Sequence, residues 1–558
     1  MSAPPPAPGA EQASLGGLWE NPLPGARWLR NWRLGEWVRG PMSPLFATFL
    51  APILTQARQV GGHARFGWQL PRTWRVREPC YAVVNGHFYA RADPDALSIV
   101  ALPARYVRGE LGGGWLARWN TEGLPAYLDR VERHRSVAVS SASSSELLRM
   151  LEDLAFDTAE LWYALGLASG GTIPLGVFLR LLGGVARETD SDDIGLLVLL
   201  SGSESPLIRE QVSLYQLARE ASASAVVTDW VDGGVFGDGP PECADTRNTG
   251  GFRERLRTHI ECYGHQTSSL DFVVPCLAEQ PDQILTALRC YQSPEARNPA
   301  SVLHTSIQRR TEATNRALAR RHGPRRAAFD RVLRRAQMHV LAREQLVFDL
   351  QRGCPLFRRV LVELGTRLVS TGALGSAEEV FFLERDELWG AFRPGGMSRT
   401  LGKRARERHG QWLERQALRP PTHIPPRDDP AWRDAMRFPF DLHSFADQGE
   451  RRARIVRGAA ASAGQVRATA RVLAAPTEFS RLQPGEVLVA VATTPDWTPL
   501  FATAGAVVTD VGAVSSHASV VAREYGIPAV VGTQDATRVI RDGDTVTVDG
   551  SAGLVHLS

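Results

Sequence analysis

The residues best suited to chemistry lie near the C-terminus, in residues 509–532 (TDVGAVSSHASVVAREYGIPAVVG). His517 follows Ser515 and Ser516, which are favourable N-cap residues, so the sequence predicts that His517 lies in the first turn of a helix. Free backbone N–H groups and the positive end of the helix dipole favour an anion at that place. The same field disfavours a cationic imidazolium, so His517 is expected to be neutral and nucleophilic.

Four roles are open to such a histidine: packed core residue, metal ligand, general base or carrier of a phosphoryl group. A metal site is disfavoured because no second His, Cys or carboxylate lies at ligand spacing in this segment. A serine hydrolase is disfavoured because Ser516 is adjacent in sequence and there is no G-x-S-x-G elbow. A serine hydroxyl could hold one ring nitrogen and fix the tautomer. Local chemistry leaves both a structural role and phosphoryl capture open.

The elements around His517 indicate a multidomain α+β protein. Residues 465–558 combine short β-branched runs, Gly/Pro/Asp turns and one helix, which predicts a small α/β domain. Residues 451–464 are expected to form a linker, with the small residues 458–464 (GAAASAG) as a flexible hinge. Residues 15–450 predict a large, mainly helical domain, and residues 1–14, rich in Pro and Ala, a disordered tail.

Within the helical domain, residues 144–167 carry apolar side chains at helical spacing behind a serine-rich start. A long basic helical stretch covers about residues 300–351 and is interrupted near Gly323-Pro324. Strand-like runs are few: residues 80–90 contain an Asn-Gly hairpin step, and residues 379–383 form a short β-like run.

Composition excludes several classes of protein. The chain has 558 residues, 43% hydrophobic and 22% charged, with a net charge of +4. This length favours two or more domains, and the small net charge does not indicate nucleic-acid binding. Six scattered cysteines without a C-x-x-C pair are typical of reduced thiols. No signal peptide or membrane-spanning stretch is recognisable, so we expect a cytoplasmic protein that contacts neither membrane nor nucleic acid.

The small domain carries a long series of family motifs: residues 485–489 (GEVLV), 494–501 (TPDWTPLF), 515–518 (SSHA), 521–532 (VAREYGIPAVVG), 542–544 (DGD) and 548–550 (VDG). With these motifs, residues 465–557 resemble the phosphohistidine swivelling domain of the phosphoenolpyruvate-utilising enzymes. The resemblance implies a β/β/α fold and a phosphorylated histidine, which falls on His517.

The upstream chain has weaker motifs: residues 40–45 (GPMSPL), 262–265 (CYGH), 342–344 (ARE), 379–383 (EVFFL) and 387–388 (EL). These make residues 19–445 similar to the substrate domain of rifampin phosphotransferases. The resemblance implies that His265 is an acceptor-side base, although a buried structural role is equally open, and that Arg343 supplies positive charge. Gln266 stands where the family usually has Arg, and Val347 where it has Lys, so two phosphate-neutralising cations are missing. Arg358 could supply charge in their place.

The acceptor pocket of such an enzyme should be largely apolar. Trp162, Tyr163, Phe178 and Tyr215 could line it, although aromatic residues at helical spacing are typical of a core as well.

The sequence shows no P-loop and no ATP-grasp unit, so we expect the chain itself to bind no cofactor and no metal. ATP and Mg²⁺ would act through a separate ATP-grasp partner subunit, because the chain is similar to the substrate/phosphohistidine subunit of phenylphosphate synthase. The hypothesis is a phosphotransferase that carries a phosphoryl group on His517 to the hydroxyl of a small, apolar or aromatic acceptor. A non-catalytic phosphocarrier or regulatory binding protein, and phosphoenolpyruvate-dependent transfer, are the alternatives.

Overall fold

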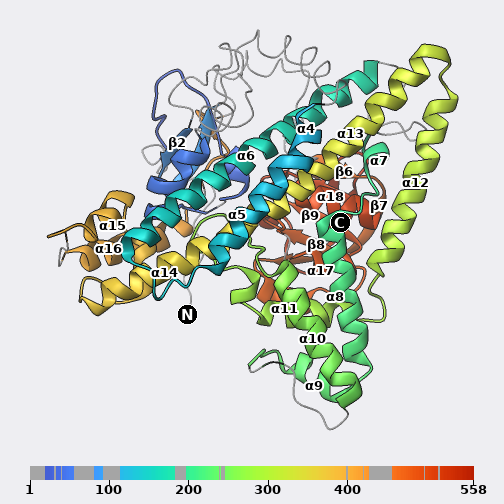
Figure 1. Ribbon diagram of the computed structural model, residues 1–558. Coiled ribbons are helices and arrows are strands. Elements are labelled where there is room, and N and C mark those ends of the chain that lie inside the picture. The colour runs from blue at the N-terminus through green and yellow to red at the C-terminus, as the bar shows by residue number, and fades with distance from the viewer. Residues whose placement is uncertain are drawn as a thin grey trace.

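The computed structural model describes residues 19–30, 33–38, 40–55, 81–91, 114–181, 196–237, 239, 246–396, 400–418, 420–426, 455–494, 497–512 and 516–558. The predicted tail 1–14 and Ser515 lie outside these residues. A large helical region precedes a smaller domain built on a sheet, as predicted, and long helices pass in front of that sheet in Figure 1. None of the helices in the described ranges is long and apolar enough to cross a membrane.

The helical region contains helices that range from one turn to 38 residues in length. Its helices are α4 (Trp115–Arg118), α5 (Leu124–Ser136), α6 (Ser144–Leu181), α7 (Leu196–Leu200), α8 (Pro206–Ser222), α9 (Ala225–Gly233), α10 (Thr246–Tyr263), α11 (Asp282–Gln292), α12 (Pro299–Ala319), α13 (Gly323–Leu350), α14 (Cys354–Ser370), α15 (Arg385–Ala391) and α16 (Leu401–Gln416).

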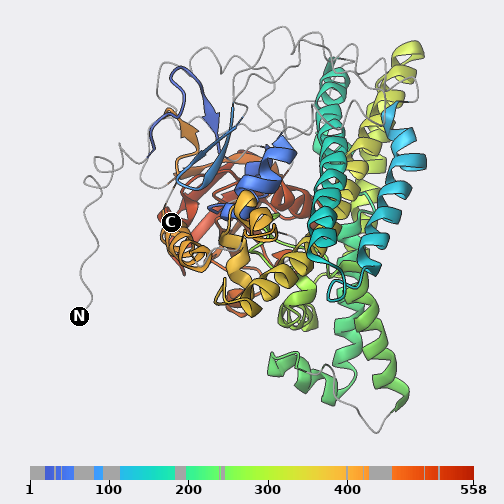
Figure 2. The ribbon, with the colours of Figure 1, turned by 60° about the vertical axis from the view of Figure 1, so that its left-hand side comes forward.

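The two longest helices, α6 and α13, lie side by side and form the spine of the region (Figures 1 and 2). The predicted interruption near Gly323-Pro324 is confirmed. Gly323 adopts a left-handed φ of 56°, and Pro324 occupies the first turn of α13, where its missing N–H costs no hydrogen bond. The sharp reversal there folds α12 back along α13.

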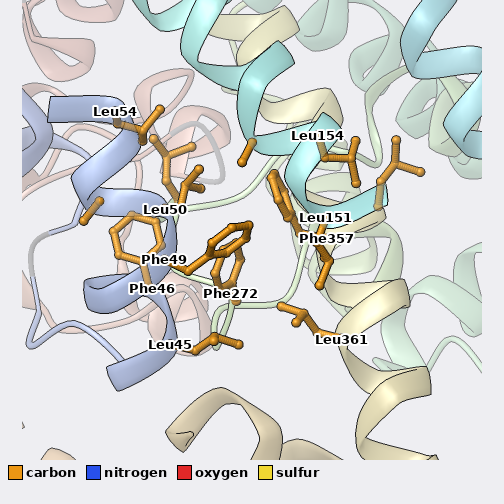
Figure 3. Packing of buried hydrophobic residues seen from close by; sticks show 14 of the residues in the cluster. Leu45, Phe46, Phe49, Leu50, Leu54, Leu151, Leu154, Phe272, Phe357 and Leu361 are labelled. Carbon is orange, nitrogen blue, oxygen red and sulfur yellow. The ribbon is translucent and has the colours of Figure 1, made fainter. Parts of the chain in front are cut away.

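One hydrophobic core holds the spine to the N-terminal segment and to α14. Figure 3 shows its centre, where the aromatic rings of Phe49, Phe272 and Phe357 lie between leucines. The ring centroids of Phe272 and Phe357 are 5.1 Å apart, and both rings are almost completely buried. Burial of several large side chains, each contributing about 1.5–3 kcal/mol, fixes the long helices against each other.

A small antiparallel sheet lies at the edge of the helical region. It has the order β2 (Tyr81–Val84), β3 (His87–Arg91), β1 (Trp28–Leu29) and β4 (His423–Ile424). Its hairpin turns at Asn85 and Gly86, whose φ values of 48° and 78° match the turn type that the Asn-Gly step predicts.

The predicted β-like run at residues 379–383 is wrong, because Ala377–Phe382 form a 3₁₀ helix. Three consecutive side chains, those of Val380, Phe381 and Phe382, are buried there, and a strand would direct the middle one to the opposite face. Packing against α14 and α16 therefore overrides the β propensity of the apolar run.

The C-terminal domain contains an eight-stranded sheet in the order β5-β12-β11-β7-β8-β9-β10-β6. Strands β7, β8, β9 and β10 run parallel to one another, and the outer strands pair antiparallel. The strands are β5 (Ile455–Arg457), β6 (Ala459–Ser462), β7 (Gln465–Leu473), β8 (Val487–Ala490), β9 (Ala506–Thr509), β10 (Ala529–Val531), β11 (Thr545–Asp549) and β12 (Leu554–Leu557), with short helices α17 (Thr498–Phe501), α18 (His517–Tyr525) and α19 (Ala536–Val539) between them.

The structure corrects the predicted hinge at residues 458–464. Strand β6 occupies most of that stretch and strand β5 ends just before it, and each forms an edge of the eight-stranded sheet. A Cβ atom at Gly458 would meet the Val531 carbonyl oxygen at 2.6 Å, so this glycine permits close packing of backbones. The small domain therefore begins by residue 455, and small residues that suggest flexibility in the sequence are here selected by tight strand packing.

The helical region and the small domain share a second hydrophobic core. Helix α8 contributes Leu214, and helix α11 contributes Leu288 and Tyr291. The small domain contributes Phe501 and Tyr525, and helices α9 and α10 add other buried side chains. The small domain is thus seated firmly against the α8–α12 helices in this structure.

Candidate functional site

His517 is placed by the topology of the parallel strands. The chain runs from β9 through α18 to β10, and β9 and β10 are parallel neighbours. The first residue of α18 therefore lies at the carboxyl edge of the sheet, where crevices of open α/β sheets bind ligands. The segment that follows the adjacent strand β8 ends in α17 at the same edge, because β8 is parallel to β9. Two loops thus converge on His517.

The local sequence fixes the start and end of α18. Ser516 has extended backbone angles and is the N-cap residue, and Gly526 ends the helix in the left-handed region at φ 64°, both as predicted. Gly512 has a φ of 152°, and a Cβ there would lie 3.1 Å from the Ser516 hydroxyl oxygen. A glycine at 512 therefore lets the loop close tightly under the helix start.

The ring of His517 is held by α17. Its Nε2 atom lies 3.2 Å from the hydroxyl oxygen of Thr498, and its ring meets Phe501 edge to face with centroids 6.4 Å apart. Thr498 and Phe501 are buried, whereas His517 is half-buried. The imidazole is therefore positioned by α17 and remains partly accessible.

Among the described residues, a hydroxyl contact to the His517 ring comes from Thr498, and Ser515 lies outside these residues. The Ser516 hydroxyl lies 3.1 Å from the Ser519 hydroxyl and makes no side-chain cap bond to the helix. Ser516 therefore does not compete for the first-turn N–H groups, which an anion can use.

The C-terminal end of α18 is anchored to the helical region. The Glu524 carboxylate accepts a hydrogen bond of 2.8 Å from the Gly202 N–H, and the Tyr525 hydroxyl donates to the Gln211 side chain at 2.5 Å. Burial raises the pKa of Glu524, because the charged form is poorly solvated at the interface. These contacts hold α18, and with it His517, against α8 and α12.

His265 lies in a different environment. It is buried, its Nε2 atom lies 3.1 Å from the Phe348 carbonyl oxygen, and its ring packs edge to face on Phe348. Because a carbonyl only accepts, Nε2 carries the proton, and the buried Nδ1 atom has no hydrogen-bond partner. Burial, with the nearby Arg352 charge, lowers the pKa of His265 to about 3. No hydrogen bond or ring contact within the described residues joins His265 to His517.

We expect His265 to contribute to the pH dependence of stability. Its folded pKa lies below the ordinary histidine value of 6.5, so the unfolded chain binds more protons between these values, and stability falls as pH drops below about 6.5. For His265→Gln, the free energy of unfolding in urea should fall less steeply, by about 1.4 kcal/mol per pH unit between pH 6 and pH 4. The exposed His304→Gln variant should keep the wild-type slope. Equal slopes in all three proteins would contradict the burial argument.

Arg343 and Arg358, the two arginines expected to supply positive charge, both form ion pairs with glutamates of the helical region. Arg343 on α13 is largely buried and its guanidinium lies 2.6 Å from the Glu344 carboxylate, while Val347 packs against the first core. Arg358 is buried as well, contacts both Glu279 oxygens at 3.0 Å and donates to the Phe272 carbonyl. The charge of Arg358 is therefore neutralised by Glu279.

Gln266 is buried, and its Nε2 atom has no hydrogen-bond partner in the described part of the chain.

The predicted acceptor aromatics do not line one pocket in the described part of the chain. Trp162 packs on Trp37 in the first core, with ring centroids 6.5 Å apart. Tyr215 packs edge to face on Tyr291 in the second core. The Phe178 side chain lies outside the described residues. Tyr163 lines a separate apolar pocket together with Trp115, Arg118, Trp119, Glu160, Ala164 and Leu167.

A second pocket lies next to Thr498, the residue that contacts His517. Its cavity volume is about 30 Å³, and Thr498 belongs to its wall. The other lining residues are Glu210, Gln211 and Leu214 of α8, Leu277 of the 3₁₀ helix Leu277–Glu279, Gln283, Ile284 and Ala287 of α11, and Pro499 of α17. We name this space the carrier pocket. Among the described residues, no group of three or more His, Cys, Asp or Glu side chains is arranged to hold a metal ion.

Sequence reasoning missed Thr498, Glu210 and Gln211 as site residues. Thr498 lies within a quoted motif, residues 494–501, and its position at the end of a strand next to the His517 strand was the available signal. Glu210 and Gln211 carry no such signal, because only the packing of α8 on the small domain brings them to the site.

Two family models match the chain. Residues 482–553 match the mobile domain of PEP-utilising enzymes, and residues 170–344 match the fourth domain of rifampicin phosphotransferase. The first match contains His517 and Thr498, and the second contains Glu210, Gln211 and His265. The C-terminal domain is therefore similar to the mobile domain of phosphoenolpyruvate-utilising enzymes, and part of the helical region is similar to a domain of rifampicin phosphotransferase.

Curated relatives agree with these matches. Chondramide synthase of Chondromyces crocatus is 29% identical over 517 residues, which cover 88% of this chain and 13% of the relative. Rifampicin phosphotransferase of Streptomyces sviceus is 30% identical over 312 residues, 55% of this chain and 34% of the relative. Phosphoenolpyruvate synthase of Aeropyrum pernix is 48% identical over 103 residues, 18% of this chain and 13% of the relative. The chain spans about a third or less of the length of each.

Proposed function

We propose that the chain is a phosphotransferase subunit that carries a phosphoryl group on His517 and delivers it to a hydroxyl of a small acceptor. The observation that supports this most directly is the placement of His517. It lies at the N-terminal end of α18, its ring contacts Thr498, and Thr498 also belongs to the wall of the carrier pocket. The relatives include a rifampicin phosphotransferase and a phosphoenolpyruvate synthase, and the segment that contains His517 matches the mobile domain of PEP-utilising enzymes.

The donor half of the proposed reaction involves a separate ATP-grasp subunit, ATP and Mg²⁺. The sequence contains no P-loop, and neither matched family model is a nucleotide-binding domain. Because ATP is the proposed donor, the proposal places the reaction in the cytoplasm.

The acceptor half can be written from the residues of this chain. The P–N bond to His517 breaks and its electron pair stays on the ring nitrogen, while a P–O bond forms at the acceptor oxygen. The acceptor proton leaves to water or to a nearby carboxylate, which leaves a neutral imidazole when the other ring nitrogen is protonated. First-turn N–H groups of α18 stabilise the phosphoryl oxygens before transfer.

The test is a labelling experiment. The full chain is purified with an ATP-grasp protein encoded beside it and given ATP labelled on the β-phosphate. We expect a label on the chain that is lost in acid and stable in alkali, as a P–N bond is, and that maps to residues 516–525 by mass spectrometry. A chain that never acquires the label would refute the carrier proposal. Label that forms but leaves for no hydroxyl compound would favour a regulatory phosphocarrier.

Thr498 is expected to assist the transfer. Replacing it by Val removes the hydroxyl next to His517 Nε2 but keeps the shape of the side chain. Loss of one such hydrogen bond, about 1–1.5 kcal/mol, should slow label formation about tenfold. Thr503→Val is the matched control, because the Thr503 hydroxyl bonds only the Leu500 carbonyl among the described contacts. Identical labelling rates in the two variants would show that the Thr498 contact is not used.

A further inference from the structure

Asp510 is a buried acidic residue at the carboxyl edge of the parallel strands, and the proposed transfer does not use it. It follows directly on β9 and is 8% exposed. Its carboxyl group accepts hydrogen bonds from the Thr537 N–H at 3.0 Å, from the Thr533 hydroxyl at 3.2 Å and from the Thr537 hydroxyl. Burial raises the pKa of Asp510, although the three donors act against that shift. A buried carboxyl group with three donors is held in one orientation.

The backbone of Asp510 is bonded to the strands on both sides of it. Its N–H donates to the carbonyl of Ala490, the last residue of β8, at 3.1 Å, and its carbonyl accepts from the Gln534 N–H at 2.9 Å. Gln534 has a left-handed φ of 72°, which a residue with a side chain adopts only where its surroundings hold it there. Asp510 therefore joins three segments: the one that follows β8, the one that follows β9, and residues 533–537 after β10.

Two of these segments meet at His517. The segment after β8 carries Thr498, whose hydroxyl oxygen lies 3.2 Å from His517 Nε2. The segment after β9 leads to Ser516, the N-cap residue of α18. A Cβ at Gly512 would lie 3.1 Å from the Ser516 hydroxyl oxygen and 3.2 Å from Val531 Cβ, so the backbone there packs tightly. A shift of this segment would therefore move the start of α18 with it.

Phosphoryl transfer is sensitive to a shift of this kind. The attacking atom, the phosphorus and the leaving atom lie roughly in line, and a displacement of about 1 Å can slow a reaction about a hundredfold. None of the described hydrogen bonds of the Asp510 side chain goes to the His517 ring. Asp510 therefore acts on the ring through the segments that it joins.

We infer that Asp510 is a positioning residue for the carrier: it fixes the start of α18 relative to Thr498 and thereby aligns the His517 ring for phosphoryl transfer. The inference rests on the proposed function, because it assumes that His517 accepts a phosphoryl group. Thr533 and Thr537 act with Asp510 by holding its carboxyl group. The Thr537 hydroxyl is the group that matters, so Thr537→Ser keeps the role and Thr537→Val weakens it.

Nuclear magnetic resonance of the His517 ring tests the inference without any phosphoryl transfer. The full chain is prepared with histidine labelled with ¹³C in the ring, and the His517 signal is the one that His517→Ala removes. In Asp510→Ala and Thr537→Val this signal should shift and broaden, because the ring is no longer held in one position and one tautomer beside Thr498. Thr537→Ser should keep the wild-type signal, and the His556 signal should stay in place in every variant.

The rate of label formation with the ATP-grasp partner is the second measurement. Asp510→Ala should slow it at least about tenfold at saturating partner, and Thr537→Val about threefold, while Thr537→Ser should stay within about twofold of the wild type. Asp549→Ala is the matched control. Asp549 accepts from two backbone N–H groups but pairs with Gln465, the first residue of β7, at the opposite edge of the parallel strands. This variant should be labelled like the wild type.

An unchanged His517 signal in Asp510→Ala would overturn the inference, and so would equal labelling rates in Asp510→Ala and Asp549→Ala. If Asp510→Ala does not fold, as judged by circular dichroism, the comparison of Thr537→Val with Thr537→Ser decides, and identical His517 signals in these two variants would overturn the inference. A wild-type chain that acquires no label refutes the proposed function, whereas the ring signal still shows whether Asp510 positions His517.

Discussion

Replacing His517 by Ala should reduce the acid-labile phosphoryl label on the chain to background, a loss of at least about a thousandfold. Alanine removes the nitrogen that forms the P–N bond, and no other residue at the start of α18 can form one. The first-turn N–H groups and the Thr498 hydroxyl remain, but they stabilise a phosphoryl group without bonding to phosphorus. The label is measured after partner-dependent phosphorylation, with and without acid treatment.

The control for this variant is His556→Ala. His556 lies on β12 in the same domain, in register with Ile455 and Thr547, so the variant removes an imidazole without touching the site. It should be labelled like the wild type. Acid-stable label on His517→Ala would indicate that a nearby hydroxyl, such as that of Ser516 or Ser519, is the phosphorylated group. Persisting acid-labile label would show that another histidine is the carrier.

The second large effect concerns stability and comes from Phe501. This side chain is fully buried in the core shared by the small domain and the α8–α11 helices, and its ring contacts His517. Phe501→Ala should lower the free energy of unfolding by about 3–5 kcal/mol, because it removes a large apolar group and leaves a cavity. Urea unfolding followed by tryptophan fluorescence measures the change, since Trp497 lies in the same core.

Val491→Ala is the matched control for Phe501→Ala. Val491 lies in the loop that follows β8 and is 54% exposed, so its truncation should change the free energy of unfolding by less than about 0.5 kcal/mol. A loss below about 1 kcal/mol in Phe501→Ala would mean that the shared core is looser than its burial indicates. In that case the small domain would not be firmly held by α8 and α11.

Turns and helix ends that depend on the backbone preferences of a few neighbouring residues were predictable from the sequence. The hairpin at Asn85-Gly86, the break at Gly323-Pro324 and the helix that starts after Ser516 each depend on backbone preferences of the residues themselves. Small residues also led to the wrong prediction of a flexible hinge at residues 458–464. Small residues there suit both a flexible linker and a closely packed edge strand, and only the neighbouring backbone of β10 decides between them.

Sequence by itself determined the identity of the carrier candidate, because a long run of local motifs surrounds His517 and a histidine at a helix start suits an anion. The tertiary structure alone decided which groups meet it. Thr498 reaches the ring because β8 and β9 are parallel neighbours, and Glu210 and Gln211 reach the carrier pocket because α8 packs on the small domain. Contacts between residues 200 or more positions apart depend on how whole elements pack, and no local preference of the chain records that packing.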